Sequence, residues 1–410
     1  MASFKVPLQS AVGAVGACSM LITLVTRLLI GLSSGANVVV AKYIGSKDKE
    51  SAEKATGTAI LVGIAGGIFL LVFGVVFAKP LLMLTNCPDS LLENATLYFQ
   101  LYFCGVPFLM LYNFSASILR AMGDTRRPMF SLLLGGTVKI ILNYLFIIGF
   151  NTTVEGVGIA TVISNLLSGG LAFYALFTHK GFMRFQFKHL KFYPKEVKSV
   201  FFIGLPTGLQ SSLYSLANVL ISSVVNRYGE YATTGISIAN QFDGVLYQIC
   251  MAAAIAAMPY IAQNVGAKNM KRVKQSIVKA MLIATAFGAS FGALSAVFSG
   301  QLASLMSDTP EVIAYAREKM IIISSTYFIC GINEIMCATM RGLGRPIIPT
   351  ISTLLFFCVF RFVWVYLIYP LCPNFTFLYL VWPIGWVLSI VTLLVFYFPT
   401  IRKMEKSLAA

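Results

Sequence analysis

The amino-acid sequence predicts an all-α integral membrane protein made of two parallel copies of one multi-helix unit. The first observation behind this prediction is an internal repeat with a constant offset of 221 residues, in which R-x-x-G-x₄-P at 120–128 recurs at 341–349. A second, distant match keeps the same offset: Ala41, Gly45 and Lys47 recur as Ala262, Gly266 and Lys268. Two such matches indicate a duplicated unit, and in an apolar chain they are typical of transporters whose two halves enclose a substrate site.

Composition is the second observation, and it places the chain in a membrane. Hydrophobic residues make up 58% and charged residues 11% of the sequence, whereas a soluble domain carries roughly 25% charged residues. The apolar runs have helix lengths, and transmembrane helices bond their own backbone groups. Eleven spans are predicted, at 11–40, 55–78, 97–121, 128–150, 157–178, 199–226, 232–262, 276–298, 318–340, 346–369 and 376–400.

The third observation is the distribution of the 31 lysines and arginines behind the net charge of +16. Most fall in one set of alternate loops, which marks the cytoplasmic side. The opposite side has only Lys5, Lys79, Arg227, Arg317 and Lys319. The basic excess therefore reflects topology, so we expect no nucleic-acid partner, and we expect a cytoplasmic C-terminus.

The repeat also predicts the domain organisation: an N-lobe at 1–179, a cytoplasmic linker at 180–197, a C-lobe at 198–401 and a cytoplasmic tail at 402–410. The first span of the second copy has no counterpart in the first copy, so the lobes hold five and six spans. We expect that a first helix preceding Met1 is missing, which would give twelve spans. The alternative is a genuine eleven-span form, and the reading frame upstream of Met1 distinguishes the two.

Four segments resemble the MATE (multidrug and toxic compound extrusion) transporters: Gly31–Gly45, Ile118–Pro128, Ile261–Lys268 and Met340–Gly344. The resemblance implies two six-helix lobes around a central cleft and export of organic cations and drugs in exchange for H⁺ or Na⁺. It implies a non-enzymatic, multi-pass protein of the bacterial inner membrane that works by alternating access. We expect a monomer in the lipid bilayer, with no cofactor besides the coupling ion and no metal site.

Asp243 and Glu334 are the carboxylates that fall well inside apolar spans. A charge at a lipid-facing helix centre costs about 2.5–3.5 kcal/mol, so such groups face protein or water and mark functional sites. Asn240 and Tyr247 share the helix face of Asp243. We predict that Asp243 and Glu334 bind the coupling cation or a cationic substrate.

Three basic residues, Arg27, Lys139 and Arg361, also lie at depth. The alternative for the carboxylates is a structural ion pair between Arg361 and one of them. Lys139 has Asn143 one turn further on, but neither it nor Arg27 has an intramembrane carboxylate beside it. In the family resembled, an acidic residue of the first helix often couples protons, and an acid there would balance this lobe.

The helix at 197–227 offers Gln210 and Asn218 but no carboxylate inside the span, unlike the sodium-coupled branch of that family. A sodium site is therefore not transferred directly from the resemblance. For the repeated R-x-x-G-x₄-P we expect the glycine to end one helix, the arginine to cap its carbonyls and the proline to start the next helix.

The rival function is flipping of lipid-linked oligosaccharides, since the wider superfamily contains flippases. A flippase would hold pyrophosphate with basic residues, and Arg27, Lys139 and Arg361 supply three. The sequence has no P-loop and only two histidines, one directly before the linker and one within it, so it lacks signatures of an ATPase or of His-based catalysis.

Overall fold

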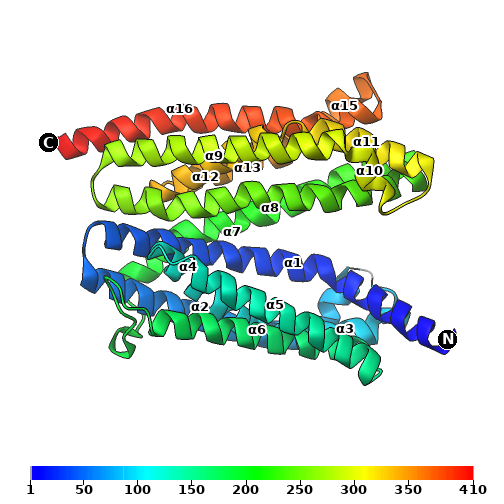
Figure 1. Cartoon of the computed structure of the whole chain (residues 1–410), viewed down its shortest axis with the longest axis horizontal. Helices are drawn as coiled ribbons and strands as arrows, with labels where there is room; N and C mark the ends of the chain where they lie inside the picture. The colour runs from blue at the N-terminus through cyan, green and yellow to red at the C-terminus, as the bar shows by residue number, and fades with distance from the viewer. Residues whose placement is uncertain (1, 86, 410) are drawn as a thin grey trace. The chain divides into compact units, whose positions relative to one another are not determined.

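The computed structural model describes residues 2–85 and 87–409, and within these ranges it is helical with no β-strand. The all-α prediction is confirmed. The chain divides into two compact units, Met1–Gly208 and Leu209–Ala410, which are described separately (Figure 1).

The first unit is a bundle in which α4 packs against α1, α2 and α6, while α5 lies along α6. A π-helical segment extends α5 and a short 3₁₀ turn lies in the connection after α6. Its elements are α1 (Ala2–Gly45), α2 (Lys49–Leu84), α3 (Asp89–Cys104), α4 (Val106–Ala121), α5 (Arg126–Tyr144), η1 (Leu145–Gly149), α6 (Val154–Phe177), η2 (Phe187–His189) and the first part of α7 (Pro194–Val225).

The second unit is organised around α8, which packs against α9, α11 and α12. α8 and α9 run side by side along most of their length (Figure 1). After the rest of α7, its elements are η3 (Asn226–Tyr228), α8 (Glu230–Gly266), α9 (Met270–Val297), α10 (Ser299–Ser304), α11 (Pro310–Ser324), α12 (Tyr327–Gly342), α13 (Ile347–Thr353), η4 (Leu354–Val359), α14 (Phe360–Val363), η5 (Trp364–Ile368), η6 (Tyr369–Leu371), α15 (Phe375–Tyr379) and α16 (Val381–Ala409).

Nine helical segments in the described ranges are long and apolar enough to cross a membrane. α11 and α12 make a tenth if the pair, bent by 49°, is counted as one span. Each overlaps one of the predicted spans. The remaining predicted span, 199–226, lies on α7, a helix of 32 residues. The division into five and six spans stays a prediction.

The boundary between the compact units falls at Gly208, inside α7. The first part of α7 belongs with the first unit because it crosses α1 closely: Cβ atoms added at Gly31 and Gly35 would meet the backbone of Gly208 and Val200, each at 2.2 Å. Small residues at a crossing let two backbones approach, as in membrane helix pairs. The predicted lobe boundaries at 179 and 198 stay a prediction.

The two copies of the repeat end their helices in the same way. Gly123 after α4 has a φ of +88° and Gly344 after α12 has +77°, a left-handed conformation that glycine adopts without strain. In both copies the next amide donates to the carbonyl five residues earlier, a Schellman bond: Asp124 to Leu119 at 2.9 Å and Arg345 to Met340 at 2.8 Å. The prediction that these glycines end helices is confirmed.

The same correspondence holds where α1 and α8 end. Lys47 and Lys268, which are related by the repeat offset, have positive φ values of 60° and 56°. The next residue in each copy caps the following helix through its side chain: Asp48 accepts from the Ser51 amide at 3.1 Å and Asn269 from the Arg272 amide at 3.0 Å. The internal repeat is therefore visible in the backbone as well as in the sequence.

The expectation that the repeated arginines cap helix carbonyls is wrong. Arg120 donates to the Ser117 hydroxyl at 3.2 Å, and Arg341 donates to the side-chain oxygen of Gln210 at 2.7 Å. Side chains on an α-helix lean toward its N-terminus. Arg120 therefore reaches back along its own helix, and Arg341 reaches across to α7, rather than toward the free carbonyls at the helix ends.

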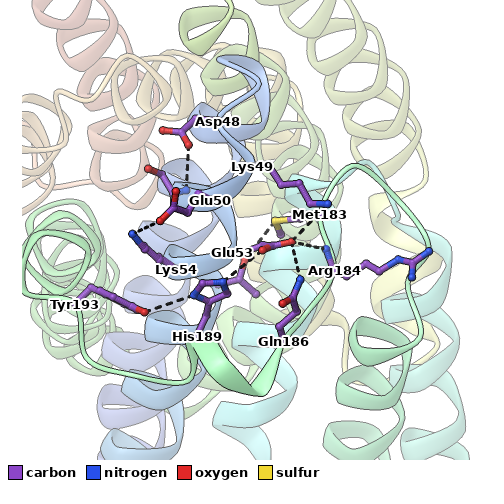
Figure 2. A network of polar contacts seen from close by, with 12 residues as sticks. Asp48, Lys49, Glu50, Glu53, Lys54, Met183, Arg184, Gln186, His189 and Tyr193 are labelled. Atoms are coloured by element: carbon purple, nitrogen blue, oxygen red, sulfur yellow. Dashed lines mark hydrogen bonds and ion pairs between the residues drawn. The ribbon is translucent and has the colours of Figure 1, made fainter.

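The connection between α6 and α7, which contains the predicted linker, lies against α2 (Figure 2). The carboxylate of Glu53 on α2 is buried, with 6% of its side chain exposed. It accepts hydrogen bonds from the Arg184 amide at 3.5 Å and the Gln186 side chain at 3.3 Å. His189 Nε2 lies 3.5 Å and Lys49 Nζ 4.0 Å from the same carboxylate. One buried acid thus gathers several contacts that hold the connection on the helix.

Candidate functional site

The second unit places the carboxylate of Asp243 against the ammonium of Lys319. Asp243 lies on α8 and Lys319 on α11, which packs against α8. The distance from Nζ to Oδ2 is 2.7 Å, and the side chains are 3% exposed for Lys319 and 14% for Asp243. Because little water reaches this pair, each charge is compensated mainly by the other.

The same ammonium has two further partners. It donates a hydrogen bond to the side-chain oxygen of Asn240, one turn before Asp243, and it lies 5.7 Å from the ring centre of Tyr379. The hydroxyl of Tyr327 donates to the Asp243 backbone carbonyl at 3.0 Å. Oδ1 of Asp243 has no hydrogen-bond partner among the described residues. Asp243 is therefore fixed in position and keeps one buried oxygen that can accept a proton.

Glu334 on α12 is the second buried carboxylate, with 2% exposure. Its carboxylate faces the hydroxyls of Tyr214 on α7 and Tyr247 on α8. The guanidinium of Arg341 attracts the same carboxylate electrostatically. Oε1 of Glu334 has no hydrogen-bond partner in the described part of the chain. The structure thus brings the predicted Tyr247 to Glu334, while the predicted Asn240 joins Asp243.

Gln210 holds the guanidinium of Arg341 near this carboxylate. Its side-chain oxygen accepts from Arg341 at 2.7 Å, and its amide nitrogen donates to the Thr353 hydroxyl at 2.8 Å and contacts Cys337 Sγ at 3.7 Å. A buried amide with both ends used has one fixed orientation. Gln210 is therefore a positioning group that links α7, α12 and α13.

Arg361 on α14 is buried, with 1% exposure. Its guanidinium donates to the Asn218 side-chain oxygen at 2.6 Å and lies over the ring of Trp382, 4.7 Å from the ring centre. Within the described ranges no carboxylate is paired with it, so the alternative of an ion pair between Arg361 and Asp243 or Glu334 is wrong. The reason is that Lys319 already occupies Asp243, while Asn218 and Trp382 give Arg361 a neutral acceptor and an aromatic face.

The first unit contains no equivalent cluster among its described residues. Arg27 is exposed, and Lys139 is partly buried on α5. Asn143 also lies on α5, and its side-chain oxygen has no hydrogen-bond partner among the described residues. The structure does not bring the predicted first-lobe residues together.

Lys319 and Arg341 are the two charged groups of this site that the sequence analysis missed. The charge distribution places Lys319 on the outer side, at the start of the predicted span 318–340, but it lies inside α11, nine residues after Pro310 begins the helix. A rise of about 1.5 Å per residue then places it more than 10 Å along that helix. The signal in the sequence is the charged residue itself, which lies after Thr309-Pro310 and before an apolar run.

Comparison with known proteins agrees with this architecture. The sequence model of the family described as MatE matches residues 6–145 and 206–367, two stretches as expected from the repeat. The probable multidrug resistance protein YoeA of Bacillus subtilis (strain 168) is 28% identical over 84% of this chain and 76% of its own. A protein of Shewanella oneidensis named FAD transporter is 26% identical over 79% of this chain and 72% of its own.

Solved structures of low sequence identity have the same fold. An outward-facing multidrug resistance MATE family transporter of the MOP superfamily superposes with a TM-score of 0.90 at 18% identity, covering 98% of this chain and 91% of its own. A MOP superfamily transporter from Pyrococcus furiosus superposes with a TM-score of 0.86 at 20% identity, covering 99% of this chain and 91% of its own. The chain therefore belongs to the MatE family, and it is a multi-pass membrane transporter and not an enzyme.

Proposed function

We propose that this transporter exports amphipathic organic cations across the cell membrane in exchange for H⁺ or Na⁺, by alternating access between its two lobes. Several relatives are named as multidrug resistance or multidrug export proteins, which supports drug-like small molecules as substrates. A gradient supplies the drive, because a potential of about 100 mV alone gives about 2.3 kcal/mol per charge.

The observation that carries the proposal is the environment of Glu334. It is a buried carboxylate with an unpartnered oxygen, faced by two tyrosine hydroxyls. Such a group binds a proton or, when ionised, a small cation together with neighbouring oxygens. Asp243 is the second carboxylate of the same unit. Their release of a coupling cation would be exchanged for uptake of the positively charged substrate.

Efflux of a fluorescent organic cation from proteoliposomes tests the proposal. The gradient is imposed as Na⁺ or as pH, one at a time, on wild type, Glu334→Gln and Asp243→Asn. Matched controls are Glu311→Gln and Asp308→Asn, which change exposed carboxylates before or at the start of α11. Flux that follows one gradient, survives in the controls and is lost in Glu334→Gln supports antiport and names the ion. Wild-type flux that is independent of both the Na⁺ and the pH gradient would refute the proposed antiport.

A second candidate, export of an anionic aromatic compound, is favoured by the charges inside the second unit. Lys319 compensates Asp243 and Arg341 acts on Glu334, which leaves Arg361 without a carboxylate among the described residues. The relative named FAD transporter fits this candidate. The flippase alternative would use the same basic residues. Loading the vesicles with a flavin nucleotide, or with a fluorescent lipid-linked sugar, separates these cases from organic-cation export.

A further inference from the structure

We propose that Lys319 determines cation specificity at Asp243: its ammonium fills the position of a monovalent cation between Asp243 and Asn240 and keeps Na⁺ out of it. The inference builds on the proposed cation-coupled transport and deepens it. It assigns different tasks to the two buried carboxylates, since no lysine forms an ion pair with Glu334 among the described residues.

The contacts of the ammonium are those of a bound cation. An ammonium has three N–H donors and no acceptor. Here it faces a carboxylate oxygen of Asp243 at 2.7 Å, the amide oxygen of Asn240, and the ring of Tyr379. Carboxylate and amide oxygens are also the ligands of hard metal cations, and aromatic faces attract cations of either kind, ammonium or metal.

The surroundings fit a cation position better than a purely structural ion pair. Asn240 is exposed and the Asp243 side chain keeps 14% exposure, so the position lies close to the surface of the unit. Oδ1 of Asp243 is left without a hydrogen-bond partner although it is buried. Removal of the ammonium would therefore leave three oxygens, two from Asp243 and one from Asn240, around an uncompensated negative charge.

While the ammonium is in place, a second cation beside it meets direct like-charge repulsion at low local dielectric. Na⁺ is then excluded from Asp243, and the carboxylate that remains available to it is Glu334. Tyr327 holds the helical turn that carries Asp243, so the geometry of this position does not depend on the lysine alone.

Binding of ²²Na⁺ to the purified full chain in detergent, with choline as the replacement cation, tests the inference without any transport. Lys319→Met removes the charge and keeps much of the stem, and Lys319→Met with Asp243→Asn removes the carboxylate as well. Lys271→Met, at an exposed position on α9, controls for loss of a positive charge. We expect Lys319→Met to gain a Na⁺ site that wild type and the control lack, and the double variant to lose it.

Two results would overturn the inference: a folded Lys319→Met that binds no more Na⁺ than wild type, or wild-type Na⁺ binding that falls in Asp243→Asn. The second comparison needs no lysine variant, so it decides the matter even where Lys319→Met fails to fold. Equal Na⁺ binding by wild type and Asp243→Asn supports the inference. Absence of antiport in vesicles would refute the proposed function and leave these binding results unaffected.

Discussion

The backbone carbonyl of His189 lies against Gly57 of α2, so that a Cβ added at Gly57 would stand 2.1 Å from the His189 oxygen. The same stretch of chain is tied to the next residue of the helix: the Thr58 hydroxyl donates to the Lys191 carbonyl at 3.0 Å and accepts from the Tyr193 amide at 3.4 Å. Contact this close requires glycine, because any side chain would collide with backbone that has no freedom to rotate away.

Gly57→Ala should therefore displace the connection and destabilise the protein by about 1–3 kcal/mol, as expected for overpacking. Limited trypsin digestion should cut faster at the exposed Arg184 and Lys188. Gly66→Ala on the same helix is the control, since its added Cβ would find only the Met110 methyl at 3.9 Å. Equal digestion of the two variants would show that the connection is not held at Gly57.

Glu53→Gln should lower thermal stability because the buried carboxylate accepts bonds from the connection (Figure 2). Hydrogen bonds to a charged group are worth about 1.5–3 kcal/mol each. Glu50→Gln is the matched control, since Glu50 is exposed and pairs with Lys54 at the surface, where such pairs are worth about 0–1 kcal/mol. A melting temperature lowered equally by both changes contradicts the assignment.

Glu196→Gln should make the protein increasingly more stable than wild type as the pH rises. Glu196, at the start of α7, is 4% exposed, and burial raises the pKa of its carboxyl, although the Tyr43 hydroxyl that donates to it at 3.0 Å acts in the opposite direction. The folded protein thus holds the proton more tightly than the unfolded chain. The stability from this group is full below its unfolded pKa of about 4.3 and is lost as the pH rises through the folded value.

Melting curves of wild type and Glu196→Gln between acidic and neutral pH check this sign. The melting temperature of the variant should rise relative to that of wild type as the pH rises, because glutamine does not ionise. At low pH the difference between the two melting temperatures should stay constant. A variant that loses stability relative to wild type at neutral pH would mean that the ionised carboxylate stabilises the fold.

Arg361→Lys should destabilise the second unit although it keeps the charge. Lysine has no planar group to lie over Trp382, and one compact ammonium replaces the guanidinium that bonds Asn218. A desolvated cation–π contact is worth about 2 kcal/mol. Arg345→Lys, at an exposed position, is the control. Thermal unfolding followed by tryptophan fluorescence measures both, and equal melting temperatures would show that the stacking contributes nothing.

Features that depend on local chemistry and on spacing could be predicted from the amino-acid sequence. Hydropathy gave the spans, because each helix must satisfy its own backbone in lipid. The repeat offset and the glycines at 123 and 344 gave the helix ends, because a left-handed residue stops a helix wherever it stands in the chain. The carboxylates Asp243 and Glu334 stood out since a charge inside an apolar run is rare.

Which side chains contact one another could not be predicted from the sequence and follows from how the helices pack. Lys319 reaches Asn240 across 79 residues of sequence, and Arg341 reaches Gln210 across 131. The bend of 49° between α11 and α12 interrupts the span after Ser324, five residues beyond Lys319, and the hydropathy of the chain does not encode it. A charge pattern gives the depth of each residue but not its neighbour, because the partner of a buried charge is set by which helix faces pack together.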